Sequence, residues 1–187
     1  MTFIKRGDTV GIAPFALESA MPQRHAIRNA RPEDADRIQQ IAHNAYSHYR
    51  SRMDRDPAPM LADFNNHIKI DTVFVISVEG EGEGEDEGEG EGDNTINGYA
   101  ILIENDDGWL LDNLAIDPNA QKSGMGKALV EHCEGFLKYL NVAKYRLYTN
   151  VAMHESLAWW LSLGFEETDR RLESGFNRIY MEKHLSR

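Results

Sequence analysis

The residues whose types and spacing suggest chemistry lie in one segment, from Asp112 to Ala128. A strand pattern stops at Pro118, a short loop follows, and a helical pattern begins near Gly124. The first N–H groups of such a helix have no intrahelical partner and lie at the positive end of its dipole, so they suit an anion such as a pyrophosphate. Gly124 and Gly126 lack side chains, which lets phosphate oxygens approach the backbone. The segment therefore predicts an anion site at a strand-to-helix junction.

The same pattern also fits an ordinary junction with two incidental glycines, because a lone Gly-x-Gly is a weak signal. A Walker loop is set aside, since the run Gly126-Lys127-Ala128 lacks its spacing and its hydroxyl. A Rossmann fingerprint is set aside as well, since Leu129 stands where a third glycine is required.

Composition limits the partners. Nine acidic residues lie between Glu79 and Asp93, and removing them from the formal net charge of −11 leaves −2. The sequence has no basic stripe of the kind that binds nucleic acid, and no run of eighteen apolar residues that would span a membrane. Met1 to Ala20 shows no secretory pattern. Cys133 is the only cysteine, so we expect a cytoplasmic protein without a structural zinc site.

The elements that must position the anion site follow from periodicity. Strands are expected over 26–30, 72–78, 95–104, 109–116, 144–150, 165–172 and 176–184. Helices are expected over 34–46, from Met60 to Ile68 after Pro57-Ala58-Pro59, over 124–139 and over 155–163. The inner face of the third helix is expected to carry Leu129, Val130, Cys133, Phe136, Leu137 and Leu140.

The order β-α-α-β-β-β-α-β-α-β-β predicts an α+β fold with one mixed, mostly antiparallel central sheet flanked by helices. We expect a single domain over 25–187, preceded by an N-terminal extension over 1–24. Residues 79–94 alternate glycine with acids and are expected to form a flexible acidic Glu/Gly loop.

Three runs, in order, resemble the GNAT superfamily of acetyl-CoA-dependent N-acetyltransferases and together cover about residues 25–185. The run Gln121-Lys122-Ser123-Gly124-Met125-Gly126 is similar to the family's Gln/Arg-x-x-Gly-x-Gly/Ala motif. Trp159-Trp160-Leu161-Ser162-Leu163-Gly164-Phe165 is similar to its aromatic-aromatic-x-x-x-Gly-Phe segment. The run from Ala26 to Ala35 looks like its first strand and helix.

The resemblance implies acetyl-CoA as co-substrate and no metal. Main-chain N–H groups from Lys122 to Ala128 would hold the pyrophosphate, and residues 114–116 would pair with the pantetheine arm. The strand over 144–150 would splay away and open a slot for the thioester, whose carbonyl would be polarised by an N–H near Ile116. The residues implied in binding acetyl-CoA are Leu114, Ala115, Ile116, Gln121, Lys122, Ser123, Gly124, Met125, Gly126, Lys127, Ala128, Asn150 and Trp160.

Direct attack of an amine on a thioester needs a base for the ammonium proton and a donor for the leaving thiolate. In the family a tyrosine often is the donor, but Trp160 stands at that position, and an indole N–H is not an acid at physiological pH. Water, another side chain, or no enzymic acid at all would then serve. Asp112 is the first candidate base, because it lies beside the slot, and Tyr148 on the facing strand is a candidate donor or relay. His154, after that strand, ranks below Asp112. A solvated or hydrogen-bonded strand carboxylate explains Asp112 equally well, and a half-buried sheet tyrosine explains Tyr148 better. His154 also fits as a helix N-terminal residue.

The resemblance places the acceptor between the first two helices and the terminal hairpin. The candidate acceptor-site residues are Tyr46, Tyr49, Arg50, Arg52, Met53, Asp54, Met60, Asp63 and Phe64. They mix aromatic walls with both signs of charge, so a small-molecule amine and a peptide amine both stay open. We also keep a homodimer open. The leading interpretation is an N-acetyltransferase, and the alternative is a non-catalytic acyl-CoA-binding or sensor module of the same fold.

Overall fold

A computed structural model describes residues 25–78 and 96–186. The expected N-terminal extension over 1–24 and the expected acidic loop over 79–94 lie outside the described residues.

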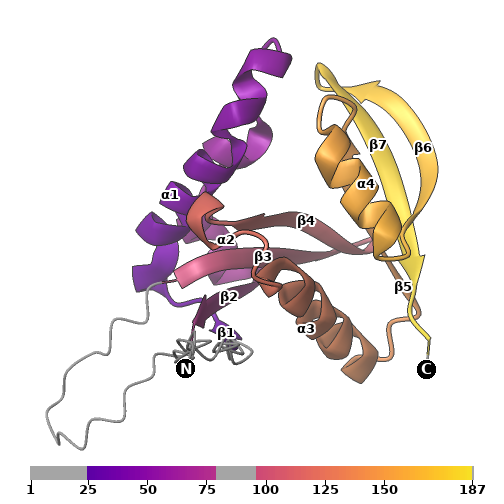
Figure 1. Cartoon of the computed structure of the whole chain (residues 1–187). Helices are drawn as coiled ribbons and strands as arrows, with labels where there is room; N and C mark the ends of the chain where they lie inside the picture. Colours follow the sequence, from indigo (N-terminus) through magenta and orange to yellow (C-terminus); the bar gives the residue numbers. More distant parts are fainter. Residues whose placement is uncertain (1–24, 79–95, 187) are drawn as a thin grey trace, which may run out of the picture.

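The described residues form one seven-stranded sheet at the centre of the structure (Figure 1). In spatial order its strands are β1 (His25–Asn29), β2 (Thr72–Val78), β3 (Ile96–Asn105), β4 (Gly108–Ile116), β5 (Lys144–Asn150), β7 (Phe176–His184) and β6 (Glu166–Glu173). Every neighbouring pair is antiparallel except β4 and β5, which are parallel. The expected α+β class with a mostly antiparallel sheet is confirmed.

Helices cover both faces of this sheet (Figure 1). On one face lie α1 (Ala35–Tyr46) and α2 (Phe64–Ile70), and on the other lie α3 (Met125–Tyr139) and α4 (His154–Ser162). Short 3-10 turns occur at η1 (Pro32–Asp34), η2 (Ser47–Arg52), η3 (Ala58–Leu61) and η4 (Pro118–Ala120). None of the described helices is both long enough and apolar enough to cross a membrane.

The strand β2 shows why the core has two halves. Its side chains alternate between the faces of the sheet, so Val73 and Val75 pack with α1 and α2, whereas Phe74 and Ile76 pack with α3. A strand buried on both faces reads as a continuous apolar, β-branched run, which is the pattern that predicted it.

Two expectations about helices are wrong. The helix expected after Pro57 is two elements, because Ala62 is extended and the Asp63 carboxylate accepts the N–H of Asn66 at 3.0 Å and so caps a new helix. Leu140 is 42% exposed rather than part of the inner face, because α3 ends at Tyr139 and the chain then turns.

The strand β4 changes its partners along its length. Ile101 faces Asn113 and Leu102 faces Leu111, so Asp112 is the extra residue of a β-bulge. On its other side β4 pairs with β5 at only two positions, Leu110 with Arg146 and Leu111 with Leu147. Beyond that point the two strands part, and the bulge lies where they do so.

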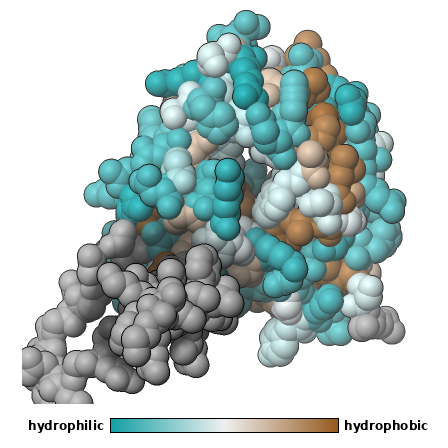
Figure 2. Space-filling view, viewed as in Figure 1, coloured by the Kyte–Doolittle hydropathy of each residue, from teal (hydrophilic) through white to brown (hydrophobic). Residues whose placement is uncertain are grey.

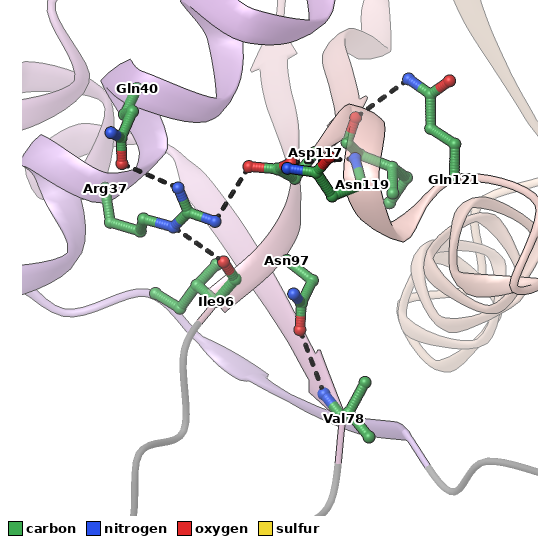
Figure 3. A network of polar contacts seen from close by, with 9 residues as sticks. Arg37, Gln40, Val78, Ile96, Asn97, Asp117, Asn119 and Gln121 are labelled. Atoms are coloured by element: carbon green, nitrogen blue, oxygen red, sulfur yellow. Dashed lines mark hydrogen bonds and ion pairs between the residues drawn. The ribbon is translucent and has the colours of Figure 1, made fainter.

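A polar network fixes the loop that follows β4 (Figure 3). The buried Asp117 carboxylate accepts from the Arg37 guanidinium at 3.0 Å and from the N–H of Asn119 at 3.1 Å. Arg37 also donates to the Ile96 carbonyl at 2.9 Å and to the Gln40 side chain at 2.7 Å. The helix α1 is thereby tied to the ends of β3 and β4, which sets where the loop toward α3 begins.

We expect Arg37→Met to lower the free energy of unfolding by about 1–3 kcal/mol, because the buried Asp117 carboxylate loses its charged partner. Urea denaturation measures the change. Arg31→Met is the control, since the Arg31–Glu33 pair is 3.9 Å apart and exposed, and its loss should cost about 0–1 kcal/mol. Equal effects of the two substitutions would contradict the role assigned to the network.

Candidate functional site

A groove of about 650 Å³ runs along the end of β4 and the loop that precedes α3. Most residues implied in binding acetyl-CoA line it, namely Leu114, Ala115, Ile116, Gln121, Lys122, Gly124, Met125, Gly126 and Lys127. Ser123 and Ala128 do not, because the Ser123 hydroxyl donates to the Ala120 carbonyl at 2.6 Å and Ala128 packs against the core.

The backbone of this loop forms a cradle. Lys122 and Gly124 adopt left-handed conformations, with φ of 64° and 88°. The N–H of Ala128 donates to the Gly124 carbonyl at 3.0 Å, so the N–H groups of Met125, Gly126 and Lys127 form the free first turn of α3. A Cβ placed on Gly124 would meet nothing within 4 Å. Open space therefore lies next to unpaired donors at the positive end of a helix dipole, and this arrangement fits a pyrophosphate.

Two residues of the loop stabilise the fold in ways that the sequence does not indicate. A Cβ on Gly126 would lie 3.3 Å from the Trp159 ring, so this glycine lets α3 pack against α4. The Gln121 amide donates to the Ile116 carbonyl at 3.2 Å and ties the loop to its strand (Figure 3).

An inner cavity of about 180 Å³ lies where β4 and β5 part. It shares Tyr46, Leu114, Ser156 and Trp159 with the groove, so the two spaces adjoin. In Figure 2 the surface is hollowed between the hydrophilic α1 side and a band of hydrophobic residues over α4. An extended ligand bound in the groove can therefore place its end between β4 and β5.

Tyr148 and Asp112 meet across this gap. The Tyr148 hydroxyl on β5 donates to Asp112 Oδ1 on β4 at 2.9 Å, and both residues line the inner cavity. Burial and the adjacent Asp112 carboxylate raise the pKa of Tyr148 well above its ordinary value. The phenol therefore keeps its proton at neutral pH, and the pair presents a carboxylate base beside a proton donor.

Tyr46 reaches the same place from α1. Its hydroxyl lies 3.0 Å from Asn113 Oδ1 and 3.1 Å from the Leu114 carbonyl oxygen, on the part of β4 that has left β5. Burial raises the pKa of Tyr46, so this hydroxyl is also a donor at neutral pH. It lines both the groove and the inner cavity, at their junction.

Trp160 and Asn150 lie in the inner cavity rather than in the groove. Trp160 is 8% exposed and packs edge-on against Phe165, with ring centroids 5.3 Å apart, so it forms part of the wall. Asn150 Oδ1 accepts the N–H of Ala152 at 2.9 Å, which turns the chain at the end of β5.

His154 is not brought to the Asp112–Tyr148 pair. It is exposed at the start of α4 and lines an outer cavity of about 380 Å³, which shares Met53, Asn150 and Phe176 with the inner cavity. Among the described residues, no three His, Cys, Asp or Glu side chains gather as they would around a metal ion.

Several candidate acceptor-site residues serve other purposes. Met60 and Phe64 are buried in the structure, Asp63 caps α2, and Arg50 pairs outward with Asp56 at 2.6 Å. Of the candidate set, Tyr46 and Met53 line the inner cavity.

Arg178 on β7 was missed. It lines the inner cavity, and its guanidinium carbon lies 4.1 Å from the centre of the Tyr148 ring. The strand pattern of the last hairpin indicates only that Phe176, Arg178 and Tyr180 share one face of β7. Which face meets β5 depends on the strand order, which the sequence does not show.

The profile of the acetyltransferase (GNAT) domain matches residues 71–167, which is more than half of the 187 residues. The chain therefore belongs to the GNAT family of acetyltransferases. Among curated proteins no sequence matches the chain.

Solved structures agree on the fold. The ribosomal-protein-S18-alanine N-acetyltransferase from Escherichia coli is similar, with a TM-score of 0.64 and 21% identity over 88% of this chain and 96% of that one. The PaiA N-acetyltransferase from Thermoplasma acidophilum, solved in complex with coenzyme A, has a TM-score of 0.65 and 17% identity over 86% of this chain and 99% of that one.

Membership of this family makes the protein an acyltransferase whose acetylation depends on acetyl-CoA. It favours the enzyme over the non-catalytic acyl-CoA-binding or sensor module of the same fold.

We expect Gly124→Val to reduce the affinity for CoA by about tenfold or more, because the new side chain fills the cradle and each charge-assisted hydrogen bond to phosphate contributes on the order of 1.5–3 kcal/mol. Titration calorimetry with CoA measures this. Gly108→Val is a matched control, since Gly108 also has a positive φ and open space but lies in the β3–β4 turn. Equal CoA affinity in the two variants would rule out the cradle as the pyrophosphate site.

Proposed function

We propose that the protein transfers the acetyl group of acetyl-CoA to a primary amine of a small molecule or peptide, by direct attack of the neutral amine on the thioester, in the cytoplasm. The observation that carries the proposal is the Tyr148–Asp112 hydrogen bond at the point where β4 and β5 part. It puts a carboxylate and a phenol beside the groove whose loop would bind the pyrophosphate of CoA.

The groove residues would bind the co-substrate. N–H groups of Met125, Gly126 and Lys127 would bind the pyrophosphate, and the free edge of β4 at Leu114 to Ile116 would pair with the pantetheine arm. The thioester would then lie in the inner cavity beside Asp112 and Tyr148. Trp160 would serve as a wall of that cavity rather than as an acid.

The Asp112–Tyr148 pair accounts for both protons of the reaction. The amine attacks in its neutral form and becomes cationic as the C–N bond forms. The Asp112 carboxylate then takes one proton from that nitrogen, and the Tyr148 phenol gives its proton to the thiolate as the C–S bond breaks. An acceptor that arrives as an ammonium first releases its extra proton to solvent. The hydrogen bond between them returns the proton from Asp112 to Tyr148, so one cycle moves a proton from amine to thiol and leaves the pair unchanged. A tyrosine from β5 thereby supplies the acid that Trp160 does not.

We expect Tyr148→Phe to lower kcat by about a hundredfold or more, as is typical for loss of a general acid, while CoA affinity is kept. Thiol release from acetyl-CoA over a panel of amines measures kcat. Tyr145→Phe is a matched control on the same strand, because the Tyr145 hydroxyl also donates to a carboxylate, Glu134 at 2.8 Å, but outside the inner cavity. Unchanged turnover in Tyr148→Phe would show that this phenol is not the proton donor.

We also expect Asp112→Asn to bring the pKa of Tyr148 down, because the carboxylate is one of the causes that raise it. Absorbance of tyrosinate during alkaline titration, with Tyr148→Phe subtracted to assign the signal, follows the change. A Tyr148 titration that is identical with and without the Asp112 charge is the contrary result.

A further inference from the structure

Arg178 is a cation held in place inside the inner cavity. Its side chain is 19% exposed and forms an ion pair with Glu173 through Nη1. Its guanidinium also lies over the Tyr148 ring, 4.1 Å from the ring centre. Both contacts restrict the side chain, so the group is positioned before any ligand arrives.

The Arg178 guanidinium has more N–H groups than its partners among the described residues can accept. Arginine carries five N–H groups. In the part of the chain that the structure describes, its one carboxylate partner is Glu173, whose Oε2 also accepts the Tyr180 hydroxyl at 2.6 Å. One shared carboxylate oxygen and one nearby phenol cannot occupy five donors, so several N–H groups are left for an acceptor within the cavity.

The charge around Arg178 also favours an anion. Arg171 on β6 lies directly opposite Arg178 in the strand register, and like charges so placed destabilise a sheet. Glu173 lies near both guanidinium groups, and Arg171 has a second carboxylate, Asp169, at 3.7 Å. On the side of the hairpin that faces the cavity, the positive charge of Arg178 is therefore only partly neutralised by Glu173, which also lies near Arg171.

Asp112 and Arg178 lie on either side of one phenol. The Tyr148 hydroxyl is 2.9 Å from Asp112 Oδ1, and the Tyr148 ring centre is 4.1 Å from the Arg178 guanidinium carbon. Both residues line the inner cavity, so a zwitterion bound there would meet an anion for its amine and a cation for its carboxylate.

We propose that the acceptor amine carries a carboxylate close to its amino group, as an α-amino acid does, and that Arg178 determines this specificity by binding the carboxylate while the amine faces Asp112. The inference rests on the proposed acetyl transfer and specifies its acceptor. A planar guanidinium matches a carboxylate with two parallel hydrogen bonds, which a neutral carboxamide cannot reproduce.

The test separates binding from turnover. Calorimetry on the CoA-loaded protein compares alanine, leucine and phenylalanine with their carboxamides and with the decarboxylated amines ethylamine, 3-methylbutylamine and phenethylamine. We expect at least one amino acid to bind about tenfold or more tightly than its two analogues, as the loss of a charge-assisted pair implies. Arg178→Gln should abolish this preference, and Arg178→Lys, which keeps the charge but loses the planar fork, should weaken it.

Arg171→Gln is the matched control, because Arg171 lies directly opposite on the hairpin but does not line the inner cavity, and it should keep the preference. Three results would overturn the proposal: equal binding of acids and analogues, no binding by any of the three amino acids, or equal losses in the Arg178 and Arg171 variants.

Thiol release from acetyl-CoA is measured in parallel. A carboxylate preference in binding without thiol release would contradict the proposed acetyl transfer and leave the Arg178 inference intact. Thiol release with no carboxylate preference would support the proposed acetyl transfer and overturn the Arg178 inference.

Discussion

The parting of β4 from β5 is the constraint on which the rest of the structure depends. The two parallel strands pair at two positions and then separate, which leaves one edge of β4 without a strand neighbour. Buried backbone groups on such an edge need other partners. The Tyr46 hydroxyl lies 3.1 Å from the Leu114 carbonyl oxygen, and the Gln121 amide donates to the Ile116 carbonyl at 3.2 Å. Side chains from α1 and from the α3 loop thus supply partners for two carbonyl oxygens of this edge, which helps the gap persist inside a sheet.

Packing holds the two halves of the sheet at this separation. Below the gap, one core cluster spans both halves, with Leu129 of α3, Leu147 of β5 and Met181 of β7 among its members. Near the gap, Arg52 of η2 reaches Glu155 of α4 at 2.9 Å. The halves are therefore joined on both sides of the opening, so the distance between Asp112 and Tyr148 is set by the whole fold rather than by the two strands alone.

Much of the fold was predictable because its signals are local. The β-branched run of β2 and the alternation in β5 and β7 gave their bounds to the residue, and Gly124 marked the start of α3. Hydrophobic periodicity does not predict the break at Ala62, because that break depends on the Asp63 side chain capping a new helix. Leu140 was misplaced since periodicity continues past the point where a helix ends.

The sequence by itself determined the family motifs, the order of the elements and the loop that fits a pyrophosphate, because each depends on residues close together in the chain. Only the tertiary structure decided which side chains meet in the inner cavity. The bulge at Asp112 and the strand order β5-β7-β6 bring Asp112, Tyr148 and Arg178 together and leave His154 outside. Such encounters depend on register and strand order between distant segments, and no local pattern of residue types encodes them.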